Sequence, residues 1–290
     1  MSRVGVDAQI VAILAVHNRC ASTMRALAAL ATGASLSQTT LHAIVVNDGS
    51  TDETTQCLLT FDGLKISIID GDGTWYWAQS MARAEAEALA ALTSSDPSWI
   101  LWLNDDVDLD DDAIERLLEI AATHPHRIIV GSTRDNASGA VTYGGLDRRG
   151  VHPLAYALVD PPSDEPRAVD SFNGNIVLVP VDVALVIGGI DGGYAHGLAD
   201  IDYGWRACEA GTPALLAPGT FGTCERNPPP PRESTLKRWR RFISIKGGGH
   251  PASMRRFLRK VRPRTWPLWW LSTYAKWWLL WPLRALRASR

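Results

Sequence analysis

The chain has 290 residues, of which 46% are hydrophobic and 21% are charged, and its formal net charge at pH 7 is −2. This length and composition are typical of a globular protein with one large domain and an appended segment. The four cysteines form no CxxC pair, which favours a reducing compartment and argues against a zinc site or a disulfide framework. They are Cys20, Cys57, Cys208 and Cys224. A single Arg before a strand-length apolar run at the amino terminus predicts no signal peptide.

The small net charge conceals two very different parts of the chain. Residues 1–231 hold 13 basic and 30 acidic residues, whereas residues 232–290 hold 16 basic residues and one acidic residue. The second part also contains seven of the twelve tryptophans. We therefore predict two regions, a domain over residues 1–231 and a basic, Trp-rich extension over residues 232–290, with the polyproline run 228–231 as a rigid spacer between them.

Apolar segments of strand length alternate with helical patterns in the first 120 residues. Strands are expected at 9–16, 41–46, 65–69 and 99–103. Helices are expected from about residue 20 to 31, from a cap at Ser50 or Thr51, and over 78–92. This alternation predicts an α/β fold with a mostly parallel, doubly wound sheet and helices on both faces. Polar residues that follow the strands then converge on one crevice.

The region after residue 128 is less regular. Short strands are expected at 128–131, 140–143 and 175–180. Helices are expected at 181–187, ending at a glycine pair, and from about 201 to 210.

An acidic cluster directly follows the fourth predicted strand. Asn104, Asp105 and Asp106 would emerge at the carboxyl end of this strand, where their oxygens suit a hard divalent cation such as Mg²⁺ or Mn²⁺. The acids from Asp108 onward have a simpler interpretation, in which Asp108 caps a helix from about Leu109 and the next carboxylates favour its dipole.

Five motifs in order resemble family 2 glycosyltransferases of the GT-A fold. They are HNR at 17–19, VVNDGSTDET at 45–54, WLNDDV at 102–107, NGNIVLVP at 173–180 and DIDYGWRACEAG at 200–211. The resemblance covers roughly residues 9–226. It implies an inverting, metal-dependent enzyme with a GT-A (Rossmann-like) sheet that uses a nucleotide-sugar donor.

On the donor side, the resemblance assigns Asp48 to the base and ribose of the nucleotide, although NDGS also suits an Asx turn. The NDD triplet takes the place of the family's DxD motif. Asn104 stands where the family has its first carboxylate, Asp105 supports the site, and Asp106 is the expected metal ligand. Further donor-binding candidates are His17, Asn18, Arg19 and Asp72.

The aromatic run 75–77 resembles runs in rhamnosyltransferase-like members of the family. Trp75 and Trp77 are donor-side candidates because aromatic faces stack on the C–H surface of sugars, and core packing is the alternative.

On the acceptor side, Asp200 takes the position of the family's general base, with Ala199 where the family often has Glu. Asn173, Gly174, His196 and Asp202 are acceptor-side candidates, and an i,i+4 ion pair with Arg206 is the structural alternative for Asp202. Many relatives carry a metal-ligating His further along. This chain has Cys224 in that stretch, and a thiol is a poor ligand for a hard cation.

Residues 266–283, WPLWWLSTYAKWWLLWPL, are long enough to suggest a membrane span. Lys276 in the middle and the Trp-rich composition favour a helix lying at the membrane interface, and the flanking arginines favour an anionic cytoplasmic leaflet. Packing of these rings against the catalytic domain is the alternative. No nucleic-acid-binding fold accompanies the tail, so we expect no nucleic-acid partner.

The sequence thus predicts an inverting, Mg²⁺- or Mn²⁺-dependent hexosyl- or rhamnosyltransferase that is cytoplasmic and peripheral at the inner face of the plasma membrane. It would move a sugar from a nucleotide donor, UDP- or dTDP-linked by preference, to a glycan or lipid-linked glycan in polysaccharide synthesis. A sugar-1-phosphate nucleotidyltransferase and a non-catalytic glycan- or nucleotide-binding module are the alternatives.

Overall fold

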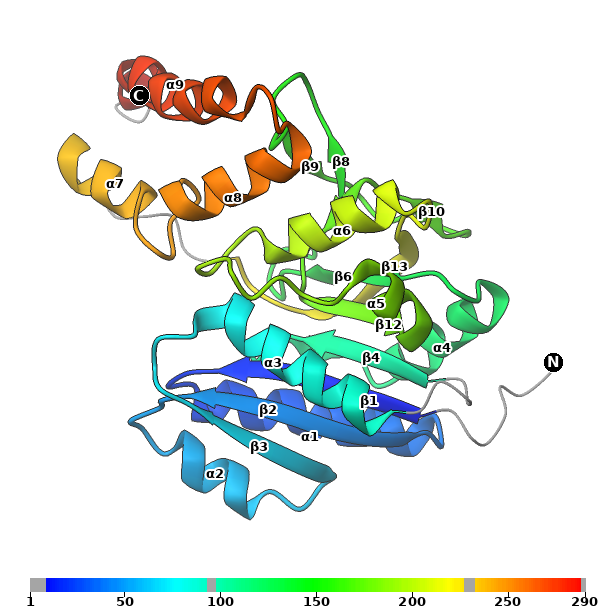
Figure 1. Ribbon diagram of the computed structural model, residues 1–290. Coiled ribbons are helices and arrows are strands. Elements are labelled where there is room, and N and C mark those ends of the chain that lie inside the picture. The colour runs from blue at the N-terminus through cyan, green and yellow to red at the C-terminus, as the bar shows by residue number, and fades with distance from the viewer. Residues whose placement is uncertain (1–8, 93–97, 227–232, 288–290) are drawn as a thin grey trace.

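A computed structural model describes residues 9–92, 98–226 and 233–287. At its centre lies a ten-stranded sheet whose main path has the order β10-β13-β6-β12-β4-β1-β2-β3 (Figure 1). The four strands predicted in the first 103 residues are confirmed, and they pair in parallel with one another. They are β1 (Gln9–Val16), β2 (Thr40–Asp48), β3 (Lys65–Gly71) and β4 (Ser98–Leu103).

The second half of the sheet is antiparallel where it joins the first. Strand β12 (Ile176–Pro180) pairs antiparallel with both β4 and β6 (Ile129–Arg134), and β13 (Leu215–Thr223) runs parallel to β6. Short strands extend this edge: β5 (Asp108–Leu109), β7 (Val141–Tyr143) and β10 (Arg167–Ala168). A separate sheet of β8 (Gly145–Arg148), β9 (Tyr156–Leu158) and β11 (Ser171–Phe172) lies beside it.

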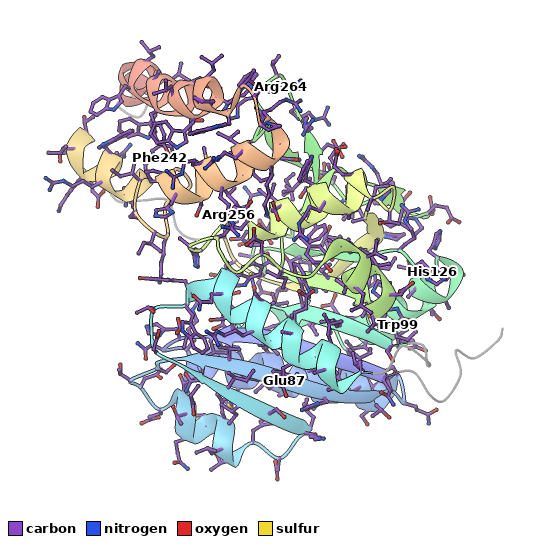
Figure 2. All side chains as sticks on the ribbon, in the orientation of Figure 1. Glu87, Trp99, His126, Phe242, Arg256 and Arg264 are labelled. Atoms are coloured by element: carbon purple, nitrogen blue, oxygen red, sulfur yellow. A yellow bond between two sulfur atoms is a disulfide. The ribbon has the colours of Figure 1, made fainter. Side chains whose placement is uncertain are left out.

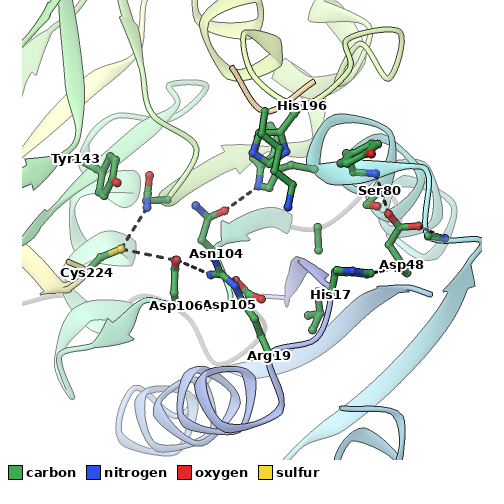
Figure 3. Close-up of a pocket in the computed structure, with 17 residues that line it drawn as sticks. His17, Arg19, Asp48, Ser80, Asn104, Asp105, Asp106, Tyr143, His196 and Cys224 are labelled. Atoms are coloured by element: carbon green, nitrogen blue, oxygen red, sulfur yellow. Dashed lines mark hydrogen bonds and ion pairs between the residues drawn. The ribbon is translucent and has the colours of Figure 1, made fainter. Parts of the chain in front are cut away.

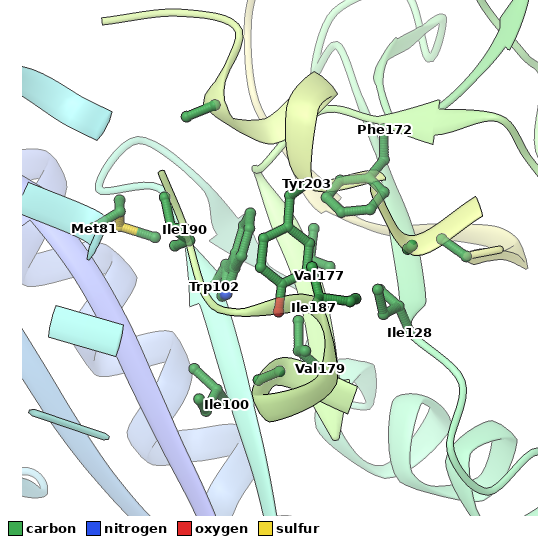
Figure 4. Packing of buried hydrophobic residues seen from close by; sticks show 14 of the residues in the cluster. Met81, Ile100, Trp102, Ile128, Phe172, Val177, Val179, Ile187, Ile190 and Tyr203 are labelled. Carbon is green, nitrogen blue, oxygen red and sulfur yellow. The ribbon is translucent and has the colours of Figure 1, made fainter. Parts of the chain in front are cut away.

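Helices cover both faces of the sheet because the strands are apolar on both faces. In β1, Val11 and Ile13 enter one core cluster, whereas Ile10 and Leu14 enter the other. The first cluster is covered by α3 (Tyr76–Ala91), α5 (Val181–Ile187) and α6 (Ala199–Glu209), and the second by α1 (Cys20–Leu36), α2 (Thr54–Thr60) and α4 (Ala113–Thr123). Figure 4 shows the first cluster around Trp102, whose ring centroid lies 4.8 Å from that of Tyr203.

The acidic run after β4 differs from the helix start predicted for it. Asp108 pairs with Thr223 in the β5–β13 ladder, and α4 begins only at Ala113, with Asp112 as its N-cap residue. Asp110 forms a two-pronged ion pair with Arg134, with both N···O distances 2.7 Å. Pairing with a strand more than a hundred residues later therefore overrides the local capping signal. The cap predicted at Ser50 or Thr51 is also wrong, since Glu53 is the N-cap residue of α2.

The cysteine prediction needs a correction as well. Cys20 and Cys57 form a disulfide, with a Cα–Cα distance of 6.3 Å. The two residues belong to α1 and α2, which pack side by side on the same face of the sheet (Figure 1). Their 37-residue separation carries no pairing signal, and only the tertiary packing of the two helices brings them together.

The C-terminal segment, residues 233–287, consists of α7 (Thr235–Phe242), α8 (Pro251–Val261) and α9 (Trp266–Arg287), so the predicted helical tail is present. It is no independent appendage, because Met254, Phe257 and Leu258 of α8 are at most 3% exposed and Phe257 and Leu258 belong to the core cluster of Trp102. The expected polyproline boundary lies outside the described residues.

Helix α9 lies above α8 in Figure 1, and Phe242, labelled at the end of α7 in Figure 2, packs its ring against Tyr274 and Trp277 of α9. Trp266, Trp269 and Trp270 pack against the same core cluster, which bears out the packing alternative for these three rings. Within the described parts of the chain, no helix is long and apolar enough to cross a membrane.

Candidate active site

A pocket of about 490 Å³ lies at the carboxyl ends of β1, β2 and β4 (Figure 3). This is the edge where open α/β sheets bind ligands. Its lining comes from the ends of several strands, the start of α3, the loop before α6 and the C-terminal segment. The lining residues are Ala15, Val16, His17, Arg19, Asp48, Gly73, Tyr76, Trp77, Ser80, Asn104, Asp105, Asp106, Tyr143, Asn175, His196, Cys224 and Lys246.

Asp48, at the end of β2, lies at one end of the pocket and is 4% exposed. Its Oδ1 accepts the backbone N–H of Gly73 at 2.9 Å, and its Oδ2 accepts that of Tyr76 at 2.8 Å. The Asp48 carboxylate therefore holds the turn at residues 71–76 in place next to the pocket, and Asp48 itself is one of the lining residues. Asp72 takes no part in the lining, since its carboxylate caps Thr74.

The three residues after β1 have different roles. His17 bonds to the backbone oxygen of Asp48 through Nδ1 at 2.6 Å and lines the pocket. Asn18 adopts a positive φ of 54°, and its Oδ1 accepts the N–H of Thr51, so it braces the loop after β2 instead of lining the pocket. Arg19 extends from the start of α1 across the pocket floor.

The Arg19 guanidinium joins the two carboxylates of the NDD triplet. Its Nη1 lies 3.1 Å from Asp105 Oδ1 and 2.6 Å from Asp106 Oδ2. Asp105 has only 10% of its side chain exposed and Asp106 has 40%, so Asp106 is the more accessible ligand. Burial raises the pKa of Asp105 to about 7, against the opposing effect of Arg19. The structure therefore brings the two carboxylates together as predicted, and one arginine forms ion pairs with both.

The aromatic run at the start of α3 divides between pocket and packing. Tyr76 and Trp77 line the pocket, whereas Trp75 lies outside the lining with Arg83 stacked 3.9 Å from its ring centroid. Trp77 donates from Nε1 to Asn104 Oδ1 at 2.8 Å. A Cβ on Gly174 would lie only 2.8 Å from the Trp77 ring, so the absence of a side chain there lets the indole approach the backbone closely.

Asp200 lies in the first turn of α6 and is not one of the residues that line the pocket. Its Oδ2 accepts the N–H of Gly174 at 3.3 Å, and its Oδ1 accepts that of Ile201 at 2.8 Å. Burial raises the pKa of this carboxyl group. Gly174 directly precedes Asn175, which lines the pocket. Asn173 points elsewhere, since its Oδ1 lies 3.5 Å from the N–H of Gly144.

His196 lines the pocket, but Asp202 does not. Asp202 is fully buried and is bonded to Arg206, Lys260 and the hydroxyl of Tyr194, each at 2.8 Å. Asp202 is therefore not an acceptor-side residue of the pocket, and it forms the i,i+4 ion pair with Arg206 that was the structural alternative. Burial lowers the pKa of His196, with Lys246 and Arg19 adding to the effect, so this ring is held neutral.

Several lining residues escaped the sequence reasoning, including Ser80, Tyr143, Asn175 and Lys246. Ser80, one turn into α3, is fully buried, and its hydroxyl has no hydrogen-bond partner among the described residues. Tyr143 comes from β7. Lys246 comes from the C-terminal segment, where only the SIKGGGH loop between two basic helices marks it. Only the tertiary fold relates these positions to the strand ends.

Cys224 closes the end of the pocket opposite Asp48 (Figure 3). Its Sγ lies 3.6 Å from Asp106 Oδ1, and Asn175 Nδ2 lies 3.7 Å from the sulfur. Burial raises the pKa of this thiol to about 12, with Asp106 adding to the effect, so it stays protonated. Within residues 9–92, 98–226 and 233–287, no group of three or more His, Cys, Asp or Glu side chains is arranged to hold a metal.

Several solved structures share the fold. The mannosyltransferase PcManGT from Pyrobaculum calidifontis, in complex with GDP-Man and Mn²⁺, is 14% identical with a TM-score of 0.55, over 91% of this chain and 69% of that one. TarS residues 1–349 from S. aureus is 11% identical with a TM-score of 0.54, over 88% and 82%. GalNAc-T7 with UDP, GalNAc and Mn²⁺ is 12% identical with a TM-score of 0.54, over 72% and 42%.

These likenesses confirm the predicted GT-A architecture, an α/β fold with a mostly parallel sheet between helices. A comparison with curated proteins gives no match. The sequence profile of Glycosyl transferase family 2 matches residues 11–172, which is more than half of the chain. The chain therefore belongs to glycosyltransferase family 2.

Proposed function

We propose that this glycosyltransferase moves a sugar, with inversion, from a nucleotide diphosphate donor to a hydroxyl of a glycan or lipid-linked glycan acceptor in cell-surface polysaccharide synthesis. The observation that carries the proposal is the pocket, which gathers Asp48, Asp105 and Asp106 from two strand ends, while Asp200 is bonded to Gly174, the neighbour of the lining residue Asn175. The similar structures support the same ligand class, because PcManGT holds GDP-Man and GalNAc-T7 holds UDP and GalNAc. A UDP- or dTDP-linked hexose or deoxyhexose such as rhamnose is the donor we would test first.

The donor would occupy the pocket between Asp48 and the NDD triplet. Asp48 would face the nucleoside, with His17 beside it, and Tyr76 and Trp77 offer aromatic surface to the sugar or base. Asn104 is held by Trp77, so its amide is oriented for a hydroxyl of the donor. The unpartnered hydroxyl of Ser80 offers one more hydrogen bond to a ligand.

A divalent cation fits the carboxylates at the pocket floor. Mg²⁺ and Mn²⁺ bind through one or two carboxylates when substrate phosphates and water supply the remaining ligands, so a cluster of three protein ligands is unnecessary. Asp106, with Asp105 beside it, would hold the ion, and Arg19 would have to give up part of its contact with Asp106. When bound, the ion would supply Lewis-acid stabilisation of the departing diphosphate. Mn²⁺ in two similar structures supports this proposal.

Asp200 would act as the general base. An acceptor hydroxyl oxygen forms the new bond to the anomeric carbon, the bond to the donor phosphate oxygen breaks, and the hydroxyl proton passes to the Asp200 carboxylate. Attack opposite the leaving group inverts the configuration at that carbon. The raised pKa of Asp200 supports this role because a more basic carboxylate accepts the proton more readily.

The test is a panel of UDP-, dTDP- and GDP-sugars, assayed for Mn²⁺-dependent hydrolysis and transfer. We expect one donor to be consumed with release of its nucleoside diphosphate. Asp200→Asn should lower turnover by about 10²- to 10⁴-fold with donor binding kept. Asp62→Asn, in an exposed loop, is the matched control. Release of pyrophosphate would favour a nucleotidyltransferase, and nucleotide binding without turnover would favour a non-catalytic module.

The C-terminal segment would place the enzyme at the inner face of the plasma membrane. Four large apolar side chains of α9 are strongly exposed: Leu268 at 68%, Leu271 at 58%, Trp278 at 47% and Leu279 at 74%. Their spacing puts them on one side of the helix, away from the rings that pack inward. The surrounding segment is strongly basic, and this combination of apolar stripe and positive charge suits an anionic lipid surface.

A further inference from the structure

The loop between α7 and α8 brings one lysine of the C-terminal segment to the donor pocket. Lys246 lines the pocket together with Arg19, Asp106 and His196, although the rest of this lining comes from residues 15–224. Lys246 is close enough to His196 to help lower the pKa of that ring. The segment that presents the apolar stripe of α9 therefore also reaches the chemistry of the pocket.

The loop that carries Lys246 is fixed on both sides. Gly247 and Gly249 pack so tightly on the end of α7 that a Cβ at either position would collide with it. Gly249 donates its N–H to Phe242 O at 2.9 Å, and its own carbonyl accepts the Tyr274 hydroxyl of α9 at 3.0 Å. These contacts fix the loop, so the backbone of Lys246 is held in one position beside the pocket.

A second contact joins this segment to the His196 loop. The backbone N–H of Ala195 donates to Ser253 Oγ of α8 at 3.1 Å. His196 follows directly, and its ring meets Tyr76 edge-on with 6.4 Å between centroids. The wall of the pocket that holds His196 and Lys246 is therefore built jointly by the domain and the C-terminal segment.

The charges of the lining leave Lys246 available to a ligand. Arg19 already pairs with Asp105 and Asp106, and Asp48 is bonded to backbone N–H groups. In the part of the chain that the structure describes, Lys246 has no carboxylate partner, and the residue is exposed. An exposed ammonium at the mouth of a pocket attracts an anion, and a diphosphate carries the densest negative charge of a nucleotide sugar.

We infer that Lys246 binds the diphosphate of the nucleotide donor, so that the C-terminal segment is part of the donor site. The inference rests on the proposed function. As the bond from the anomeric carbon to phosphate oxygen breaks, its electron pair stays on that oxygen, and the Lys246 ammonium stabilises the added charge without giving up its proton. This contribution matters here because Asn104 stands where a further carboxylate would anchor a cation.

The test compares nucleotide binding by the full chain in EDTA, so that no metal contributes. UDP, dTDP and GDP are titrated calorimetrically against wild type, Lys246→Met and Lys246→Arg, with the matching nucleosides as second ligands. We expect Lys246→Met to weaken the preferred diphosphate by about tenfold, as for loss of one charge-assisted hydrogen bond, with nucleoside binding unchanged. Lys246→Arg should restore most of the affinity. Lys237→Met, on exposed α7 and outside the pocket, is the matched control.

Two results would overturn the inference in different ways. Equal diphosphate affinity in wild type and Lys246→Met, with unaltered thermal melting, would remove Lys246 from the site and leave the proposed function intact. Failure of the wild-type protein to bind any of the three diphosphates, with or without Mn²⁺, would overturn the proposed function itself.

Discussion

Glu85 is a carboxyl group almost completely enclosed by the core, with 1% of its surface exposed. It projects from α3 and accepts the backbone N–H of Ile190, while its second oxygen has no partner among the described residues. Burial raises its pKa from 4.5 to about 7, and the opposing effects of this N–H and of Arg206 are smaller. Glu85 therefore favours the protonated form in the folded protein.

This shift makes the stability depend on pH in a defined window. The unfolded chain releases the Glu85 proton near pH 4.5, whereas the folded chain keeps it to about pH 7. The contribution of Glu85 to the free energy of unfolding is thus complete below pH 4.5. On the order of 3 kcal/mol of this contribution is lost as the pH rises to 7. Glu85→Gln should remove this loss, so that its free energy of unfolding rises relative to wild type across the window and levels off above it.

Urea unfolding of both proteins from pH 4 to pH 8 measures the difference. Glu87→Gln, two residues along the same helix and exposed, is the control and should follow wild type at every pH. A constant difference between Glu85→Gln and wild type over this range would contradict the assigned pKa shift.

Individual site residues were predictable where they follow a buried strand. Asp48, Asp105 and Asp106 come directly after apolar runs, and the carboxyl ends of parallel strands meet at one edge, so the pocket gathers them as expected. Asn18 and Asp72 share this location, yet Asn18 bonds to the loop after β2 and Asp72 bonds to its own loop. Which of two neighbouring polar residues turns inward depends on backbone angles that the sequence pattern does not specify.

At the scale of elements, the best-predicted parts are strands with both faces buried and helices with strong patterns. Strand β1 and helix α5 have the bounds expected for them, because each combines an uninterrupted apolar pattern with a clear end signal such as Gly188 in the left-handed conformation. Strand β5 was read as a helix start because its two residues are defined only by pairing with β13. Elements stabilised by distant partners leave no local pattern.

Helix α8 is joined to α6 by an element-scale ion-pair network. Lys260 lies 2.8 Å from Asp202 and 2.6 Å from Asp191. Arg256, on the side of α8 that faces the domain (Figure 2), forms an ion pair with Asp191 at an N···O distance of 2.7 Å. Asp202 is fully buried, so removing one of its cations leaves charge in a poorly solvated place. Asp202 also lies two residues after Asp200, on the same helix.

Lys260→Met should therefore destabilise the protein by about 2–3 kcal/mol, since Arg206 continues to compensate part of the charge on Asp202. Denaturant unfolding measures this loss. In a double-mutant cycle with Asp202→Asn, the two effects should be clearly non-additive because the residues are in direct contact. Additive effects would show that α8 is held by its apolar face alone.

At the scale of the whole molecule, the strong charge asymmetry of the sequence does not coincide with a structural boundary. The acidic domain and the basic segment share one apolar core, in which Phe257 and Leu258 are fully buried. Charge and composition show where the chain changes character, but they carry no information on whether the second part folds alone. Deleting residues 232–290 would expose this core and destabilise the domain. Loss of membrane binding in such a truncation would therefore not separate a membrane role from unfolding.

Point variants on α9 test the membrane surface without removing α8. Leu271→Glu and Leu279→Glu place a charge on the exposed apolar stripe, where the wild-type leucines are already in solvent and contribute little to folding. Burial of a leucine in the lipid interface is worth about 1.5–3 kcal/mol, so each variant should weaken binding to vesicles by roughly tenfold or more.

Cosedimentation with phosphatidylserine-containing vesicles, compared with pure phosphatidylcholine vesicles, measures this effect. Binding by wild type should require the anionic lipid and should weaken with added salt, because the basic residues of the segment supply the charge term. Leu59→Glu is the matched control, since Leu59 is 67% exposed on α2 at the opposite end of the molecule (Figure 1). If Leu271→Glu and Leu279→Glu sediment with anionic vesicles as well as Leu59→Glu does, the stripe of α9 faces some other partner and the membrane assignment is lost.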